Sequence, residues 1–215
     1  KYIKFFKFNK SKISMPKKQK IYIDPYKDSH SPKAISGEKD ACGVGFVAHI
    51  KGIESNWILK ESLRGLDCME HRGGCGGDSD SGDGAGILCS IPWTYLSKYS
   101  DFEIDETVQV GLGMIFMPQD ENLIKAIKII CEEEASNLNF SKTIWREVPV
   151  NKDVLGSLAK ANAPFIIQWF VSFDKNIKDF EFLLFQLRKK IEKKVKHNLP
   201  MQDDFYFASF SSKTV

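Results

Sequence analysis

The segment PFIIQWFVSF, at residues 164–173, limits the fold of this chain more than any other stretch. In an extended strand, successive side chains point to opposite faces, so the apolar residues of this segment fall on both faces. A strand of this kind is stable only where both faces of its sheet are covered. The segment therefore predicts a layered fold built on a central sheet.

Periodic segments on either side supply the other expected elements. Apolar residues that alternate with polar ones or glycine predict strands at 42–50, 86–92, 108–118 and 143–150, and in the closing segment 205–215. Apolar residues three and four positions apart predict helices at 56–70, 121–138 and 180–198. The order is strand, helix, strand, strand, helix, strand, strand, helix, strand. We therefore expect an α+β domain with helices layered on a sheet.

The first forty-one residues differ from the rest of the chain. Residues 1–20 contain eight lysines and no acid, and three prolines interrupt the stretch up to residue 40. No helical or strand period is sustained there, so we expect 1–41 to be a leader or propeptide and the domain to occupy 42–215. The last residues, FYFASFSSKTV, stop inside an expected strand. We therefore expect the chain to be a fragment of a longer domain.

Composition argues against several classes of partner. The formal net charge of +3 is too small to indicate nucleic-acid binding. No apolar run approaches the roughly 18–20 residues that a membrane-spanning helix needs. The five cysteines are an odd number, which favours free thiols in a reducing compartment over a disulfide framework.

The glycine-rich stretch HRGGCGGDSDSGDGAG, at 71–86, raises the question of a calcium or phosphate site. An EF-hand beginning at Asp78 would need oxygen ligands at its fifth and twelfth positions, which are Gly82 and Cys89. The glycines match neither the P-loop nor the dinucleotide-binding pattern, and the neighbouring aspartates have the wrong charge for phosphate. Neither site is expected here.

Two motifs together indicate a family. DACGVGFVAHIKG begins at Asp40, and CMEHRGGCGGDSDSGDGAGIL follows about 25 residues later. This pair closely resembles the opening of the glutaminase domains of glutamate synthases, which are class II glutamine amidotransferases. The resemblance implies the four-layer αββα sandwich of N-terminal-nucleophile hydrolases, incomplete here at its C-terminal end. It also implies that Cys42 becomes the first residue once a leader is removed, and acts as the nucleophile on glutamine.

The chemistry explains why a cysteine suits that position. A thiol with a pKa near 8.5 is mostly protonated at neutral pH and needs a base to become a good nucleophile. Cleavage between Ala41 and Cys42 would expose an α-amine, with a reference pKa of about 7.7–8.0, on the same residue. Gly43 would leave room beside the nucleophile. Arg72 aligns with an arginine that many members of the superfamily carry near the nucleophile, and we expect it to organise the site.

The resemblance also implies what the rest of the protein does. Ammonia from glutamine would pass to a synthase region that reductively aminates 2-oxoglutarate to glutamate. FMN and an iron–sulfur cluster belong to that region, and we expect residues 1–215 to bind no cofactor or metal. The sequence of the glycine-rich stretch resembles that of ferredoxin-dependent enzymes more than that of enzymes with an NAD(P)H-linked subunit. The implied compartment is the cytoplasm or the plastid stroma.

In this superfamily, an Asn-Gly pair forms the oxyanion hole and an Arg-containing segment holds the ends of glutamine. No equivalent of either occurs within 1–215. An oxyanion-hole donor contributes about 100- to 1000-fold in rate, so we expect the fragment alone to be inactive.

Two alternatives remain open from the sequence. Another class II amidotransferase would deliver ammonia to a different acceptor, such as an amino sugar, a purine precursor or asparagine. A small zinc-binding interaction module would use four soft ligands, although these lack a paired C-x2-C spacing. Those ligands would be Cys68, His71, Cys75 and Cys89.

Overall fold

The computed structural model describes residues 43–69, 80–82, 84–98, 108–199 and 204–215. The chain divides into two units, Lys1–Asp40 and Ala41–Val215, and every described residue belongs to the second unit. The expected leader at 1–41 therefore lies outside the described residues.

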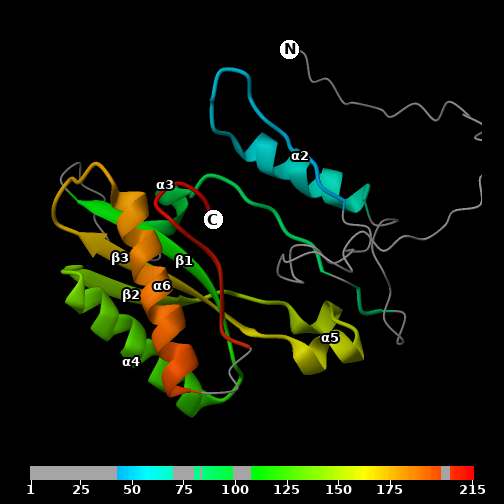
Figure 1. Ribbon diagram of the computed structural model, residues 1–215. Helices are drawn as coiled ribbons and strands as arrows, with labels where there is room; N and C mark the ends of the chain where they lie inside the picture. The colour runs from blue at the N-terminus through cyan, green and yellow to red at the C-terminus, as the bar shows by residue number, and fades with distance from the viewer. Residues whose placement is uncertain (1–42, 70–79, 83, 99–107, 200–203) are drawn as a thin grey trace, which may run out of the picture. The chain divides into compact units, whose positions relative to one another are not determined.

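The second unit is organised around a four-stranded sheet with the strand order β2-β3-β1-β4 (Figure 1). All three strand pairs are antiparallel. The strands confirm the four that the sequence predicted in the second half of the chain, three from alternation and one, at 164–173, from its apolar run. They are β1 (Gln109–Met117), β2 (Lys142–Glu147), β3 (Phe165–Phe173) and β4 (Tyr206–Ser211).

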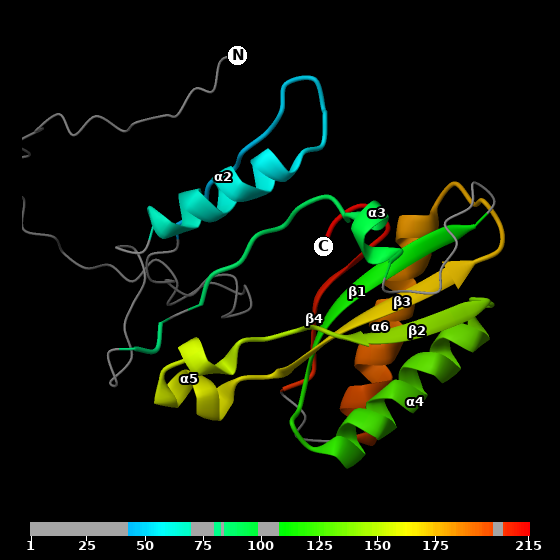
Figure 2. The same cartoon turned by 180° about the vertical axis from the view of Figure 1, so that it is seen from behind.

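Two long helices, α4 (Glu121–Asn137) and α6 (Phe180–Asn198), cover one face of this sheet, and the view from behind agrees (Figures 1 and 2). Ile127 of α4, Leu184 of α6 and Trp169 of β3 meet in the same core and are fully buried. Asp120 caps α4 by accepting hydrogen bonds from two backbone N–H groups of its first turn, at 2.8 and 3.0 Å. A cap of this kind stabilises a helix by about 1 kcal/mol.

The opposite face of the sheet is also covered at its centre. Leu112 of β1 and Phe170 of β3 pack there with Ile91 and with Leu96 of the short helix α3 (Trp93–Leu96). The strand at 164–173 is thus buried on both faces, as its composition predicted. The expectation of an α+β domain is confirmed.

Of the elements expected nearer the N-terminus, the helix is present and a strand is not. α2 (Asn56–Asp67) confirms the helix predicted at 56–70. The strand predicted at 42–50 is wrong for the described residues 43–50, which form no ladder. Val44, Phe46 and Ile50 are 87–93% exposed. Alternation alone does not make a strand, because the backbone N–H and C=O groups also need a neighbouring strand to bond.

The strand predicted at 86–92 is reduced to a single bridge between Ser90 and Thr214. Cys89 and Val215 exchange two backbone hydrogen bonds of 2.9 Å, and the N–H of Ile91 donates to the carbonyl of Lys213 at 3.0 Å. The prediction of a full strand is therefore wrong, because the segment pairs over three residues only.

The connection between β2 and β3 contains two short elements that the sequence did not indicate. They are the 3-10 helix η2 (Lys152–Val154) and the α-helix α5 (Ser157–Asn162). Neither is long enough to display an amphipathic period. Within the described residues, no helix combines the length and the apolar character needed to cross a membrane.

Candidate active site

Gly43 is the one expected site residue that the structure describes, since Cys42 and Arg72 lie outside the described residues. Gly43 lies against Met69, because a Cβ added to Gly43 would come within 3.0 Å of the Met69 sulfur. Met69 follows α2 and precedes Arg72 by three positions. The structure therefore brings the flanks of the two motifs into contact, although they are separated by a helix in the sequence.

His49, in the first motif, has a local structural role. Its Nδ1 accepts hydrogen bonds from the backbone N–H groups of Lys51 and Ile53, both at 3.3 Å. These bonds close the turn at Gly52, whose φ of +66° favours glycine. His49 thus stabilises the turn that leads from the first motif toward α2.

A buried serine holds the far end of the glycine-rich stretch. The hydroxyl of Ser81, which is 7% exposed, accepts a hydrogen bond from the backbone N–H of Ala159 at 2.9 Å. Gly156 lies beside it, so closely that an added Cβ would come within 2.7 Å of backbone atoms of Asp80 and Ser81. The connection between β2 and β3 therefore contacts the segment that ends the second motif.

A second contact fixes the segment that leaves the glycine-rich stretch. The carboxylate of Glu181, in the first turn of α6, accepts hydrogen bonds from the hydroxyl of Ser211 at 2.9 Å and the N–H of Ser212 at 2.8 Å. The hydroxyl of Ser212 donates to it as well. The residues just beyond this turn, 213–215, are those that pair with 89–91. Glu181 therefore fixes the partner of the segment that follows the glycine-rich stretch.

Two of the described cysteines, Cys89 and Cys131, have thiols with a raised pKa. Desolvation raises the pKa of the half-buried Cys89 thiol. Burial, with a smaller contribution from Glu132, raises the pKa of Cys131, which is fully buried in the core. A raised pKa reduces the thiolate fraction at neutral pH, so neither thiol is activated.

Two of the four possible zinc ligands, His71 and Cys75, lie outside the described residues. Across the described ranges, no three His, Cys, Asp or Glu side chains gather in an arrangement that would hold a metal ion. The other two possible ligands are Cys68, which is exposed, and Cys89, which is half-buried.

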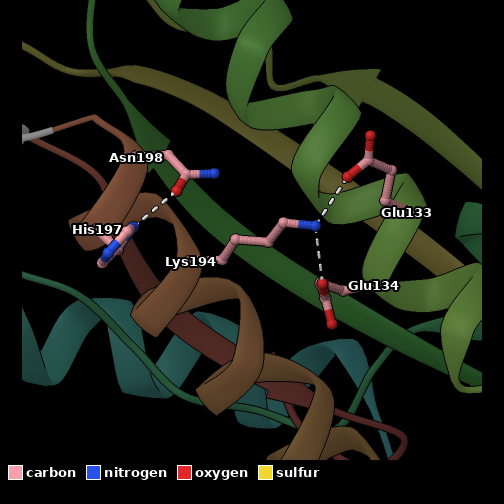
Figure 3. A network of polar contacts seen from close by, with 5 residues as sticks. All are labelled: Glu133, Glu134, Lys194, His197 and Asn198. Atoms are coloured by element: carbon pink, nitrogen blue, oxygen red, sulfur yellow. Dashed lines mark hydrogen bonds and ion pairs between the residues drawn. The ribbon is translucent and has the colours of Figure 1, made fainter.

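Two surface hollows have no motif residue in their lining. One, of about 480 Å³, is formed by the end of β2, the β2–β3 connection and the start of β3, including Glu147, Lys152 and Pro164. The other, of about 370 Å³, is lined by Glu134 of α4 and by residues of α6 that include Lys194. Lys194 donates hydrogen bonds to Glu133 at 2.8 Å and Glu134 at 3.0 Å, so it ties the two helices together (Figure 3). In this role Lys194 is part of the scaffold.

Sequence reasoning identified the motif residues but missed Ser81, Gly156 and Glu181. Their roles depend on contacts with residues more than 29 positions away in the chain. The only local signal was Ser81 itself, a serine among the aspartates of the glycine-rich stretch. The sequence did not indicate which residue Ser81 contacts.

The family comparison agrees with the motifs. The model of the family described as "Glutamine amidotransferases class-II" matches residues 42–215. The match covers all the described elements and includes Cys42, Gly43 and Arg72.

Individual relatives are similar over most of this chain. A chloroplastic ferredoxin-dependent glutamate synthase of Oryza sativa subsp. japonica is 38% identical over 209 residues, which is 94% of this chain and 13% of the relative. The ferredoxin-dependent glutamate synthase of Cyanidium caldarium is 40% identical over 187 residues, which is 84% of this chain and 12% of the relative. Ferredoxin-dependent glutamate synthase 2 of Synechocystis sp. is 38% identical over 183 residues, which is 83% of this chain and 11% of the relative.

The chain thus spans about an eighth of the length of these curated relatives. The similarity confirms the resemblance to the glutaminase domain of ferredoxin-dependent glutamate synthases that the motifs indicated. On the family match over residues 42–215, this chain belongs to the class II glutamine amidotransferases.

Proposed function

We propose that Cys42 is the nucleophile of a glutamine amidotransferase and that its own α-amine, released by cleavage of the Ala41–Cys42 bond, is the base. The observation that carries this proposal is the contact between Gly43 and Met69, which places the residue after Cys42 beside the segment that leads to Arg72. The family match, which begins at Cys42, supports the same boundary between leader and domain.

In the proposed reaction, the nucleophile and the base both belong to the new N-terminal residue. The Cys42 sulfur bonds to the side-chain amide carbon of glutamine while the thiol proton moves to the α-amine. The carbon–nitrogen bond then breaks, and the amine returns the proton to the leaving nitrogen, which departs as ammonia. Water cleaves the thioester, which releases glutamate and restores the thiol. Arg72 organises the site in this scheme.

For the whole protein, we propose that the ammonia is used for reductive amination of 2-oxoglutarate to glutamate. The relatives described above are all named ferredoxin-dependent glutamate synthases, which favours this acceptor over an amino sugar, a purine precursor or asparagine. FMN and an iron–sulfur cluster would belong to a separate synthase region, with ferredoxin as the electron donor. No cofactor is assigned to residues 1–215. The plastid stroma or the cytoplasm is the proposed compartment.

We also propose that the sheet is one half of a four-layer αββα sandwich. One helical layer and one sheet are in place. The face of the sheet opposite α4 and α6 is apolar at its centre, at Val110, Leu112 and Phe170, where Ile91 and Leu96 cover it. A second sheet on this side, with a second helical layer beyond it, would complete the sandwich. The oxyanion hole and the residues that hold the ends of glutamine would come with it.

The test uses the full-length protein. We expect intact-mass analysis to find Cys42 at the mature N-terminus, and 6-diazo-5-oxo-L-norleucine, a glutamine analogue with an electrophilic carbon, to label it. Cys42→Ala should abolish both labelling and glutamine-dependent glutamate formation. Cys68→Ala, which removes an exposed thiol, should leave both unchanged. A mature protein that keeps Ala41, or a Cys42→Ala variant with the parent's turnover, would overturn the proposal.

A further inference from the structure

Helix α5 lacks the side-chain cap that short helices usually need. Its first N–H groups have no partner within the helix, and a Ser, Thr, Asp or Asn at the N-cap position normally accepts one of them. The N-cap of α5 is Gly156, which has no side chain. The acceptor must therefore come from elsewhere.

Ser81 supplies it from 78 positions away in the chain. Its hydroxyl accepts from the N–H of Ala159 at 2.9 Å, and Ala159 is the third residue of α5. That is the N–H to which an N-cap side chain would bond. Ser81 is buried, so its hydroxyl makes this bond away from bulk solvent.

Gly156 is a glycine because a side chain at this position would have no room. Its φ of −61° is one that any residue adopts, so its backbone conformation does not require glycine. A Cβ there would come within 2.6 Å of the Ser81 hydroxyl oxygen and within 2.7 Å of the Asp80 carbonyl carbon and the Ser81 nitrogen. The missing side chain allows two backbone segments to touch.

The two contacts join the glycine-rich stretch to the connection between two strands of the central sheet. α5 lies in the connection between β2 and β3, which are paired along six residues of the central sheet (Figure 1). Asp80 and Ser81 belong to the same motif as Arg72. Asp80 and Ser81 therefore lie against the connection between β2 and β3.

We propose that Ser81 and Gly156 are positioning residues for the glutaminase reaction. Their contact holds Asp80 and Ser81, which belong to the motif that also contains Arg72, against α5. This inference rests on the proposed function of Cys42. Misplacing a catalytic group by about 1 Å can cost about 100-fold in rate, so the contact acts on the chemical step.

The test compares variants of the full-length protein in glutamine-dependent glutamate formation. Ser81→Ala removes one oxygen atom, and Gly156→Ala forces the two segments apart. Each should lower kcat by about tenfold or more and leave KM for glutamine within about threefold, because the residues proposed to hold the ends of glutamine lie elsewhere. Labelling of Cys42 by 6-diazo-5-oxo-L-norleucine should slow in proportion.

Matched controls separate positioning from loss of folding. Gly65→Ala is the control glycine variant, because a Cβ there meets nothing within 4 Å. Ser97→Ala is the control serine variant, since Ser97 is exposed and its hydroxyl donates to the carbonyl of Thr94, three positions before it. Both controls should keep the parent's kcat. The flavin absorption spectrum should be unchanged in every variant.

The double variant Ser81→Ala/Gly156→Ala should be no slower than the slower single variant, because both changes release the same segment. If Gly156→Ala does not fold, Ser81→Ala alone decides the question. Parent kcat and labelling rate in Ser81→Ala would overturn the inference, whether or not its melting temperature falls. Failure of the proposed function would appear differently, as undiminished turnover in Cys42→Ala.

Discussion

Glu181 and Ser212 are joined by two hydrogen bonds, one from the backbone N–H at 2.8 Å and one from the hydroxyl, both to the same carboxylate oxygen. They connect the first turn of α6 to the turn that follows β4. Partial burial alone would raise the pKa of Glu181, but the bonds from Ser212 and Ser211 outweigh it and lower that pKa below its ordinary value of 4.5. The charged form is therefore favoured in the folded protein.

The lowered pKa predicts a pH-dependent contribution of Glu181 to stability. A group whose pKa is lower in the folded state stabilises it fully above the unfolded pKa, near 4.5, and loses this effect as the pH falls through the folded pKa. Glu181→Gln should therefore lower the melting temperature of the 215-residue chain at pH 6–7. The difference from the parent should shrink as the pH falls below about 4.5.

Glu54→Gln is the matched control, because Glu54 is exposed. Its melting temperature should equal that of the parent across the same pH range. A Glu181→Gln difference that stays constant down to pH 3 would show that the charge of the carboxylate contributes nothing.

Close packing between β1 and α6 predicts that Gly111 does not tolerate a side chain. A Cβ at Gly111 would lie 2.6 and 2.9 Å from the two methyl carbons of Leu184, which is fully buried. Overpacking of this kind costs about 1–3 kcal/mol, so Gly111→Ala should lower the free energy of unfolding in urea by that amount.

Gly45→Ala provides the comparison, because a Cβ at Gly45 meets nothing within 4 Å. It should change the free energy of unfolding by no more than about 0.5 kcal/mol. Leu184→Val should make room, so the double variant Gly111→Ala/Leu184→Val should cost less than the sum of the two single changes. Strict additivity would argue against the contact.

The ion pairs of Lys194 predict a stabilisation that disappears at high pH. Hydrogen bonds to Glu133 and Glu134 raise the pKa of Lys194 above its ordinary value of 10.5. Its contribution is therefore present below pH 10.5 and is lost as the pH rises through the raised value. Lys194→Met should lower the melting temperature slightly at pH 7 and in low salt, and the difference should narrow in high salt and above about pH 10.5.

Lys190→Met is the control, since Lys190 lies on the same helix and forms no ion pair with any described residue. The difference in melting temperature between Lys190→Met and the parent should depend on neither salt nor pH. A Lys194→Met difference that is independent of both salt and pH would mean that the side chain acts through packing of its stem.

The long elements were predictable because burial repeats along them. The stripe of Leu187, Ile191 and Val195 on α6 is buried as its spacing predicted, and β3 is buried on both faces. The residues at 43–50 have the same kind of alternation but no strand among the described residues to pair with. A local pattern reports which faces are apolar, and it does not report whether a neighbour is present.

The candidate site was predictable only where residue order carries its signature. Cys42 and Arg72 were identified from two motifs, and Gly43 from its place beside the nucleophile. Ser81 and Gly156 act through each other across the chain, so neither stands out in its own segment. α5, which connects them to the sheet, has six residues and is too short for a helical period.

We expect the isolated fragment not to turn over. Purified residues 42–215 should hydrolyse glutamine at no more than about a hundredth of the full-length rate, because their sequence contains no Asn-Gly pair of the kind that forms the oxyanion hole in this superfamily. The comparison needs equal concentrations, with ammonia release as the measurement. Cys42→Ala in the same fragment gives the background. Robust hydrolysis above that background would mean that residues 42–215 form a complete site.

The proposed base predicts the pH dependence of the full-length enzyme. An α-amine accepts the thiol proton only when it is neutral, so kcat/KM for glutamine should rise with pH and level off above about 7.7–8.0. If a histidine were the base, the midpoint of this rising limb of the pH profile would lie near the ordinary histidine pKa of about 6.5. His71 lies beside Arg72 in the motif, so His71→Gln separates the two possibilities. If the amine is the base, the midpoint of the limb stays where it is in this variant, whatever happens to the maximal rate. A limb near pH 6.5 in the parent that disappears in His71→Gln would assign the proton transfer to the imidazole, and cleavage before Cys42 would no longer be needed to explain the chemistry.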